Sequence, residues 1–390
     1  MTDDTPPSAD DTPPAKRQCQ RFVTENYWKS KGVFGTPREL ERLLGTGSHG
    51  DVWSSAMFIG GKRTVVAVKI ETDDAGHLEN EVRVLHDLAA ASGSDLFTPM
   101  VHWNGKYSFN KLEHNAFAMD LCGPSLNTLR KEKCAGKLSM KDTLMVGDQL
   151  LAAFEHIHDL GFLQVTVKDA NVAVRAGAPE QLMLVDFGRG RTYLDDEGVH
   201  IKETRDYVIK DGEGGRKILH YTDGLGSDKF VGTCFSVNGW HGNVLSRRDD
   251  LESVGYTLFR VMRGLLPWES DEGRERVLTQ DDYDRAHSDC LAKAKYADCP
   301  SWIWPQAPSP VFADFVAYAR ALKFDERPDY AHWRGRFKRA FSRLGYAGWR
   351  LRQGVDANEI ANNPTAILAD SPFEPSPAGD VWSFGPFQWM

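Results

Sequence analysis

The stretch F-L-Q-V-T-V-K-D-A-N at Phe162–Asn171 decides how this chain is interpreted. It is followed by the apolar run Leu182–Val185 and then by Asp186-Phe187-Gly188. An apolar strand that delivers an aspartate into a loop is a common way to present a Mg²⁺ ligand. The tripeptide D-F-G alone is common and could be a simple turn. Fifteen residues after Asn171, and with Lys168 three positions before that asparagine, it becomes specific.

Upstream of this stretch, the chain from about Arg38 has the pattern of strands. The segment G-T-G-S-H-G at Gly45–Gly50 lies between two of them. Glycines let such a turn approach phosphates closely while backbone N–H groups point at them. A lone G-x-G-x-x-G is a weak signal, because hairpins use glycine anyway. No helix follows at once, which argues against a dinucleotide-binding turn.

A lysine follows on the next predicted strand. Thr64–Ile70 is rich in β-branched residues and carries Lys69, and a lysine on a central strand is costly to bury without a partner. His77–Leu88 has the apolar spacing of a helix, and we predict that Glu81 on this helix pairs with Lys69. The alternative is an exposed edge lysine with a surface glutamate. A further short strand is expected at Ala116–Leu121.

The second half of the chain has mainly helical patterns. Ser139–Asp142 resembles a capping box at the start of a helix that Gly161 ends. Asp249 and Asp250 are expected to cap a nearly all-apolar helix that runs through Met262. Two amphipathic helices are expected later, at Phe312–Leu322 and Tyr330–Leu344.

Composition excludes several classes of protein. The formal charge of −8 over 390 residues disfavours general nucleic-acid binding, which needs a basic face. The six cysteines contain no C-x-x-C pair, which indicates reduced thiols of the cytosol or nucleus. No run approaches the roughly 20 apolar residues that span a bilayer, so we expect no membrane association. Residues 1–35, which begin with D-D-T-P-P twice, are expected to be a disordered arm.

Several longer segments carry a resemblance to a known family. They are L-C-G-P-S-L at 121–126, S-V-N at 236–238, S-R-R-D-D-L-E-S-V-G-Y at 246–256, L-P-W at 266–268 and F-D-E-R-P-D-Y at 324–330. With them, the chain from about residue 40 to 345 resembles protein kinases of the casein kinase 1 group, including its vaccinia-related relatives. The resemblance implies an α+β, bilobal protein kinase fold, with a β-rich N-lobe at 36–121, a helical C-lobe at 122–350 and a tail at 351–390.

The resemblance also implies roles for individual residues in binding ATP and Mg²⁺. The nucleotide would contact Gly45, Gly47, Gly50, Val52, Ala67, Lys69, Glu81, Met119, Asp120, Leu121 and Cys122. Lys69 would hold the α and β phosphates, Met119 would be the gatekeeper, and 120–122 would be the hinge that meets adenine. Asn171 and Asp186 would bind Mg²⁺, and Lys168 would reach the γ-phosphate.

The departures from the family cluster where the acceptor hydroxyl would lie. The family's H-R-D motif reads Gln164-Val165-Thr166 here. The aspartate of that motif orients the attacking hydroxyl and accepts its proton, whereas Thr166 is neutral and a very poor base. General-base assistance is typically worth about 10²–10⁴ in rate, so we expect a large loss. Asp169 could substitute only in a rearranged loop, and we expect it to be an exposed loop carboxylate.

The two other replaced positions have consequences as well. Val165 removes an arginine that pairs with an activation-loop phosphate in many kinases. Gln164 replaces a histidine beneath the D-F-G phenylalanine, and its amide needs partners there or costs about 1–3 kcal/mol. The segment 188–232 is longer than in the family and Gly-rich at 211–215, while 232–236 is shorter and lacks the arginine that receives a primed substrate's phosphate. The group's specificity for phosphorylated substrates is therefore not expected.

Two functions are compatible with these residues. The first is a pseudokinase, a monomer of the cytoplasm or nucleus that binds Mg-ATP and acts by binding another protein. The alternative is an active serine/threonine protein kinase with an atypical catalytic loop and a protein substrate. A phosphotransfer reaction on a substrate other than protein is a distant third. The tail ends V-W-S-F-G-P-F-Q-W-M, and we expect it either to dock on the domain or to present a linear motif to a partner.

Overall fold

A computed structural model describes most of the segments discussed above. The described residues are 37, 39–47, 50–71, 76–92, 97–109, 112–195, 197–203, 206–210, 216–220, 234–240, 243–266, 311–343, 349–351, 373–375 and 387. The predicted arm at 1–35, the tip of the glycine-rich turn at 48–49, the Gly-rich stretch at 211–215 and most of the tail lie outside these residues.

The N-terminal part is a five-stranded antiparallel sheet in the order β1-β2-β3-β5-β4. Its strands are β1 (Arg42–Gly47), β2 (Gly50–Ile59), β3 (Lys62–Glu71), β4 (Val101–Phe109) and β5 (Leu112–Asp120). Strand β3 is central and carries Lys69, as the β-branched pattern predicted. Strand β5 begins four residues before the predicted start at Ala116, because residues 112–115 also pair with β4.

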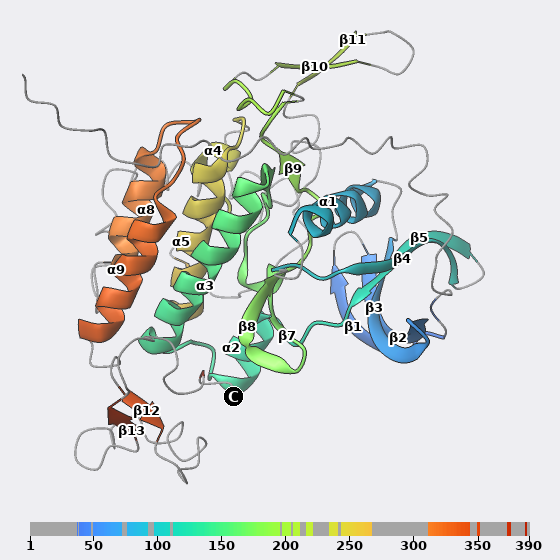
Figure 1. The fold of residues 1–390 in the computed structure, drawn as a ribbon, viewed down its shortest axis with the longest axis horizontal. Helices are drawn as coiled ribbons and strands as arrows, with labels where there is room; N and C mark the ends of the chain where they lie inside the picture. Colours follow the sequence, from blue (N-terminus) through green and yellow to red (C-terminus); the bar gives the residue numbers. More distant parts are fainter. Residues whose placement is uncertain are drawn as a thin grey trace, which may run out of the picture.

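Helix α1 (His77–Ser92) packs on one face of this sheet (Figure 1). Its apolar stripe is buried in one cluster with residues of β3 and β5: Leu78, Val82, Leu85, Leu88, Ala67, Phe117 and Met119. Alternate residues of the same strands form a second cluster on the opposite face: Val66, Val68, Ile70, Ala116 and Ala118. This period of two is what a sheet with two buried faces requires.

Helices dominate the rest of the described chain. They are α2 (Leu126–Lys133), α3 (Met140–Asp159), α4 (Val237–Trp240), α5 (Arg247–Arg263), α8 (Val311–Ala321) and α9 (Tyr330–Arg343). Helix α3 packs against α5 and α9, and α5 also packs against α8 (Figure 1). The fold is therefore α+β, as predicted, with an antiparallel sheet first and helices afterwards. None of the described helices is long and apolar enough to cross a membrane.

Short strands follow helix α3 along the chain. Strand β6 (Phe162–Leu163) pairs with β9 (Arg191–Thr192), and β7 (Val172–Arg175) pairs with β8 (Ala178–Leu184). The 3₁₀ turn Asp169–Asn171 precedes β7. Two further antiparallel pairs are β10 (Asp206–Lys210) with β11 (Arg216–His220), and β12 (Trp349–Leu351) with β13 (Phe373–Pro375).

Helix α3 starts as the sequence predicted, and helix α5 does not. The hydroxyl of Ser139 accepts the backbone N–H of Asp142 at 3.0 Å. Helix α5 begins after Ser246, whose backbone N–H donates to Asp249 Oδ2 at 2.8 Å. Asp249 thus caps the start of α5, as predicted. Asp250 takes no part in capping, so the prediction for Asp250 was wrong. Asp250 instead faces the candidate site.

The tail contributes to the core at Phe387. Its side chain is only 2% exposed and belongs to the large apolar cluster that joins α1, α3, α5, α8 and α9. Of the two predicted alternatives, docking on the domain therefore holds at this residue. The three cysteines of the described residues, Cys122, Cys134 and Cys234, carry free thiols.

Candidate functional site

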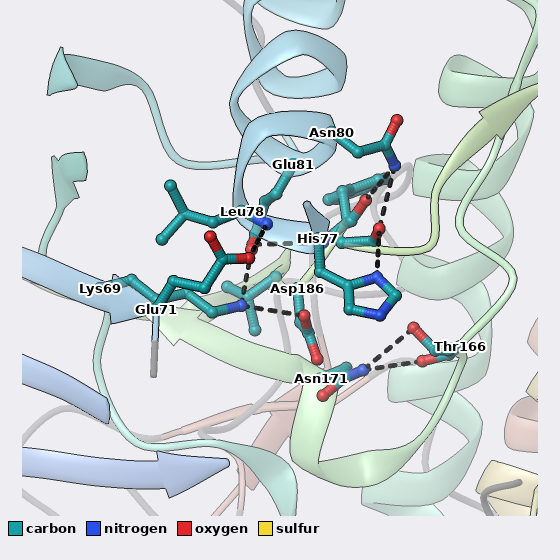
Figure 2. A network of polar contacts seen from close by, with 12 residues as sticks. Lys69, Glu71, His77, Leu78, Asn80, Glu81, Thr166, Asn171 and Asp186 are labelled. Carbon is teal, nitrogen blue, oxygen red and sulfur yellow. Dashed lines mark hydrogen bonds and ion pairs between the residues drawn. The ribbon is translucent and has the colours of Figure 1, made fainter. Parts of the chain in front are cut away.

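Lys69, near the end of β3, is the centre of a cluster of charged side chains (Figure 2). Its Nζ lies 2.6 Å from Glu81 Oε2 and 3.1 Å from Asp186 Oδ1. The Lys69 side chain is 12% exposed and that of Glu81 only 1%, so the predicted pair is present and the alternative of a surface pair is wrong. Burial alone would lower the pKa of Lys69, but Asp186 and Glu81 together raise it well above its ordinary value. The ammonium group is charged at any physiological pH.

Glu81 also connects this cluster to the loop after β8. Its second carboxylate oxygen, Oε1, accepts the backbone N–H of Phe187 at 3.2 Å. Asp186 has φ +64°, a left-handed conformation that aspartate adopts more readily than most residues. Its side chain is 38% exposed. The carboxylate of Asp186 is therefore both anchored by Lys69 and open to a ligand.

Asn171 lies beside Asp186 and faces Thr166 (Figure 2). Its Nδ2 donates to the backbone carbonyl of Thr166 at 2.8 Å and lies 3.4 Å from Thr166 Oγ1. Because the nitrogen is used in this way, Oδ1 is the atom of the Asn171 amide that could hold a metal ion. Asn171 and Asp186, the two residues expected to bind Mg²⁺, thus lie side by side, and Thr166 contacts Asn171.

A strained turn places Thr166. The N–H of Thr166 donates to the Gln164 carbonyl at 2.8 Å, and Val165 between them has φ +70°. These are the features of a γ-turn with positive φ, which is rare, and a β-branched residue is especially unfavourable in it. Such strain costs about 1–3 kcal/mol and persists only where the surroundings impose it.

Asp250 supplies the group that holds this turn. Its Oδ2 accepts the N–H of Gln164 and its Oδ1 that of Val165, each at 2.9 Å. Its Oδ2 also lies 3.1 Å from Nε2 of the fully buried His158, whose Nδ1 lies 2.6 Å from the Tyr330 hydroxyl. Burial lowers the pKa of His158, and a neutral ring that donates to Asp250 and accepts from Tyr330 satisfies all three groups.

One feature of the sequence points to this role of Asp250. Two consecutive aspartates precede the apolar part of α5, whereas a capping box uses only one acidic side chain. The second carboxylate therefore needed another partner. Its location in the sequence does not reveal that the partner is a backbone turn 85 residues away.

The prediction made for Asp169 was also wrong. It is 0% exposed rather than an exposed loop carboxylate. Its carboxylate contacts two arginines from different helices: Arg260 of α5 through a short hydrogen bond, and Arg130 of α2 at 3.4 Å. A carboxylate that is buried and held between two guanidinium groups is not accessible to a substrate hydroxyl. Asp169 therefore fastens the loop and does not replace the missing base.

Only the nitrogen of the Gln164 side-chain amide has a hydrogen-bond partner among the described residues. The side chain is fully buried, and its Nε2 donates to the backbone carbonyl of Val185 at 2.8 Å. Its Oε1 is buried and has no hydrogen bond to any of the described residues. The predicted local change in the core is thus visible as one satisfied and one unsatisfied atom. The bond to Val185 ties the turn before Thr166 to the residue before Asp186.

The glycine-rich turn lies at the β1–β2 hairpin. Gly47 pairs with Gly50, and Val52 pairs with Lys69 on β3. A Cβ on Gly50 would lie 2.1 Å from the Ile70 carbonyl oxygen, so the packing of β2 on β3 requires this glycine. Among the described residues, a Cβ on Gly45 would meet no atom within 4 Å. Gly45 is therefore free of a packing requirement, which leaves room for the predicted contact with a nucleotide.

The predicted hinge follows β5. Met119 is 7% exposed and pairs with Ala67, so both lie under the sheet's inner face. Asp120 accepts from the backbone N–H of Met100 at 3.0 Å and lies 2.7 Å from His102 Nε2, which commits its carboxylate to the sheet. Leu121 and Cys122 are half-buried, and burial raises the pKa of the Cys122 thiol to about 12.

The predicted residues thus come from separate elements to one end of the sheet. Lys168 is half-buried in the loop between Thr166 and Asn171. Within the described ranges, no three His, Cys, Asp or Glu side chains gather in a way that could hold a metal ion by themselves. A comparison of the chain with protein-family models finds no match.

Proposed function

We propose that this chain is a protein kinase-like domain, similar to the casein kinase 1 group, that binds Mg-ATP and is impaired in phosphoryl transfer. In this proposal the five-stranded sheet with α1 is the small lobe, and the helical part from α2 onward is the large lobe. The observation that carries it is the convergence of Lys69, Glu81, Asp186 and Asn171 beside Thr166.

The residues present suit a phosphate–magnesium ligand. Lys69 offers a fixed cation for phosphate oxygens, and Asp186 and Asn171 offer the oxygen ligands that Mg²⁺ prefers. Mg²⁺ is commonly held by one or two carboxylates together with substrate phosphates, which agrees with a site that has few protein ligands of its own. Mg-ATP, when bound, supplies the phosphoryl group. The protein's contribution is to position that group and to stabilise its charge.

The impairment follows from Thr166. A hydroxyl can accept a hydrogen bond from an incoming substrate alcohol, but it cannot take up the alcohol's proton at neutral pH. Asp169 is paired with Arg130 and Arg260 and cannot serve instead. The domain would then act chiefly by binding a protein partner, with the nucleotide as a structural ligand.

The second candidate is an active serine/threonine kinase with an atypical loop. The ion pair of Lys69 with Glu81 and the placement of Asn171 and Asp186 are more than a scaffold needs. Positioning and metal electrostatics carry much of phosphoryl transfer, so some activity can survive without the base.

Phosphate incorporation into an acidic, casein-like protein separates the two. We expect Thr166→Asp to exceed the wild type by about 10²–10⁴, because a carboxylate there acts as base and accepts from Asn171 Nδ2. Asp186→Ala should be inactive. Wild-type activity equal to that of Thr166→Asp, and lost in Asp186→Ala, would establish the second candidate.

A further inference from the structure

Asn80, in the first turn of α1, contacts the loop after Asp186 through one side-chain amide. Its Nδ2 donates to the backbone carbonyls of Gly190 at 2.8 Å and Gly188 at 3.0 Å, and lies 3.4 Å from that of Phe187. One amide nitrogen has two hydrogens, so it satisfies the two nearer carbonyls fully and shares with the third. Figure 2 shows this nitrogen directed at the loop, on the side of Glu81 away from Lys69.

Arg83 fixes the orientation of that amide. Its Nη2 donates to Asn80 Oδ1 at 2.9 Å, and its Nη1 lies 3.4 Å from Asp87 Oδ2. Because the oxygen of Asn80 is held by a guanidinium group, the nitrogen must face the loop. The amide is therefore a donor preorganised for backbone carbonyls.

The loop is shaped to bring its carbonyls to Asn80. The Gly190 N–H donates to the Phe187 carbonyl at 2.8 Å, which closes a tight turn. A Cβ on Gly190 would lie 3.0 Å from that same carbonyl oxygen, so a larger residue would disturb the turn. The His77 ring adds a further contact, with Nδ1 3.4 Å from the Gly188 carbonyl.

We propose that Asn80 is a positioning residue for Asp186. Asn80 locks the loop 187–190 to helix α1 and thereby fixes the carboxylate of Asp186. Glu81, the next residue of α1, holds both Lys69 and the Phe187 N–H. Helix α1 therefore sets the nucleotide-binding cation and the metal-binding carboxylate at the same time. This inference rests on the proposed function. It predicts that Mg²⁺ raises the affinity for ATP, and that this gain depends on Asn80.

The experiment measures ATP affinity by calorimetry with Mg²⁺ and with EDTA, and takes the ratio of the two dissociation constants. We expect Asn80→Ala to lower this metal enhancement about tenfold, a typical coupling between two sites, while affinity in EDTA changes little. Asn80→Asp should lower it at least as much, because a carboxylate would face three carbonyl oxygens. A purely structural role would weaken both affinities equally.

The chain offers a matched control in Asn127. It lies in the first turn of α2, and its Oδ1 accepts from Arg130 at 3.1 Å, as Asn80 Oδ1 accepts from Arg83. Asn127→Ala should leave the metal enhancement at the wild-type value. An unchanged enhancement in both Asn80 variants would overturn the proposal.

Hydrogen exchange without any ligand tests the lock independently of ATP. The backbone amides at 187–190 should exchange faster in Asn80→Ala than in the wild type, and Asn127→Ala should show no change. Equal exchange in wild type and Asn80→Ala would refute the lock. A wild type that binds no ATP would refute the proposed function instead, and the exchange result would still decide the lock.

Discussion

Thr166 reaches the candidate site at the end of a turn that its own residues disfavour. Val165 at φ +70° would relax without the two hydrogen bonds from the backbone N–H groups of Gln164 and Val165 to Asp250. The carboxylate that imposes this geometry comes from α5, far away in the sequence. At this scale the candidate site depends as much on Asp250 as on Lys69, Asn171 and Asp186.

Asp250→Asn should therefore destabilise the protein strongly. Asparagine keeps one acceptor, but in either orientation its NH₂ group faces a backbone N–H, that of Gln164 or that of Val165, so at least one charged hydrogen bond is replaced by a repulsive contact. We expect a loss of about 2–3 kcal/mol in the free energy of unfolding, measured in urea.

Asp159→Asn is the control for this substitution. Asp159 is 52% exposed and pairs with Arg327 at the surface, so its change should cost less than about 1 kcal/mol. Equal losses in the two variants would contradict the role assigned to Asp250.

At the scale of elements, the start of α5 fastens the segment before it. Asp249 Oδ1 accepts from the Ser236 hydroxyl at 3.0 Å and from Asn238 Nδ2 at 3.1 Å, while its Oδ2 accepts from the Ser246 N–H. Burial raises the pKa of Asp249 from its ordinary value of 3.8 to about 7. The carboxyl that joins α4 to α5 thus titrates near neutrality.

This shift makes stability depend on pH with a definite sign. Between about pH 4 and pH 7 the folded protein retains a proton on Asp249 that the unfolded chain has lost, so stability falls as pH rises through this window. Asp249→Asn has no such titration. The stability of wild type minus that of the variant should fall across the window when both are unfolded in urea. Parallel pH profiles of the two proteins would show that Asp249 is ionised throughout.

The tail is a second element whose contribution can be measured. Phe387 is 2% exposed in the main cluster, so Phe387→Ala should cost about 3 kcal/mol, the range for deleting a buried phenylalanine. Phe58→Ala is the control, since Phe58 on β2 is 44% exposed and should change stability by about 0.5 kcal/mol or less. A Phe387 effect as small as that of Phe58 would mean that the tail does not dock in solution.

At the scale of the whole molecule, the sequence predicts what local patterns and charge balance determine. The α+β order follows from the apolar periods, and the partner of Lys69 follows from the cost of burying a lone cation. The partners of Asp250, Asp169 and Asn80 do not follow. They are backbone groups or arginines that lie 85, 91 and 110 residues away, and only tertiary packing brings them together.

The same limit explains the wrong predictions. Asp169 follows Lys168 in a polar loop, which is typical of exposed residues, but α2 and α5 each place an arginine against it. A buried ion pair of this kind cannot be inferred from composition, because the charges that compensate it are distant in sequence. Site residues on a strand or helix with a regular pattern were predictable, whereas those that hold the loops were not.

The change in melting temperature that Mg-ATP causes is the decisive measurement for the proposed Mg-ATP site. A ligand at 100 times its dissociation constant stabilises the folded state by about 2.7 kcal/mol, so the wild type should melt at a higher temperature with Mg-ATP. The rise should be absent in Lys69→Ala and Asp186→Ala, each compared with its own ligand-free protein, because Lys69→Ala also leaves the buried Glu81 without its cation. A wild type whose melting temperature does not change, or a Lys69→Ala variant that gains as much as the wild type, would contradict the proposed Mg-ATP site.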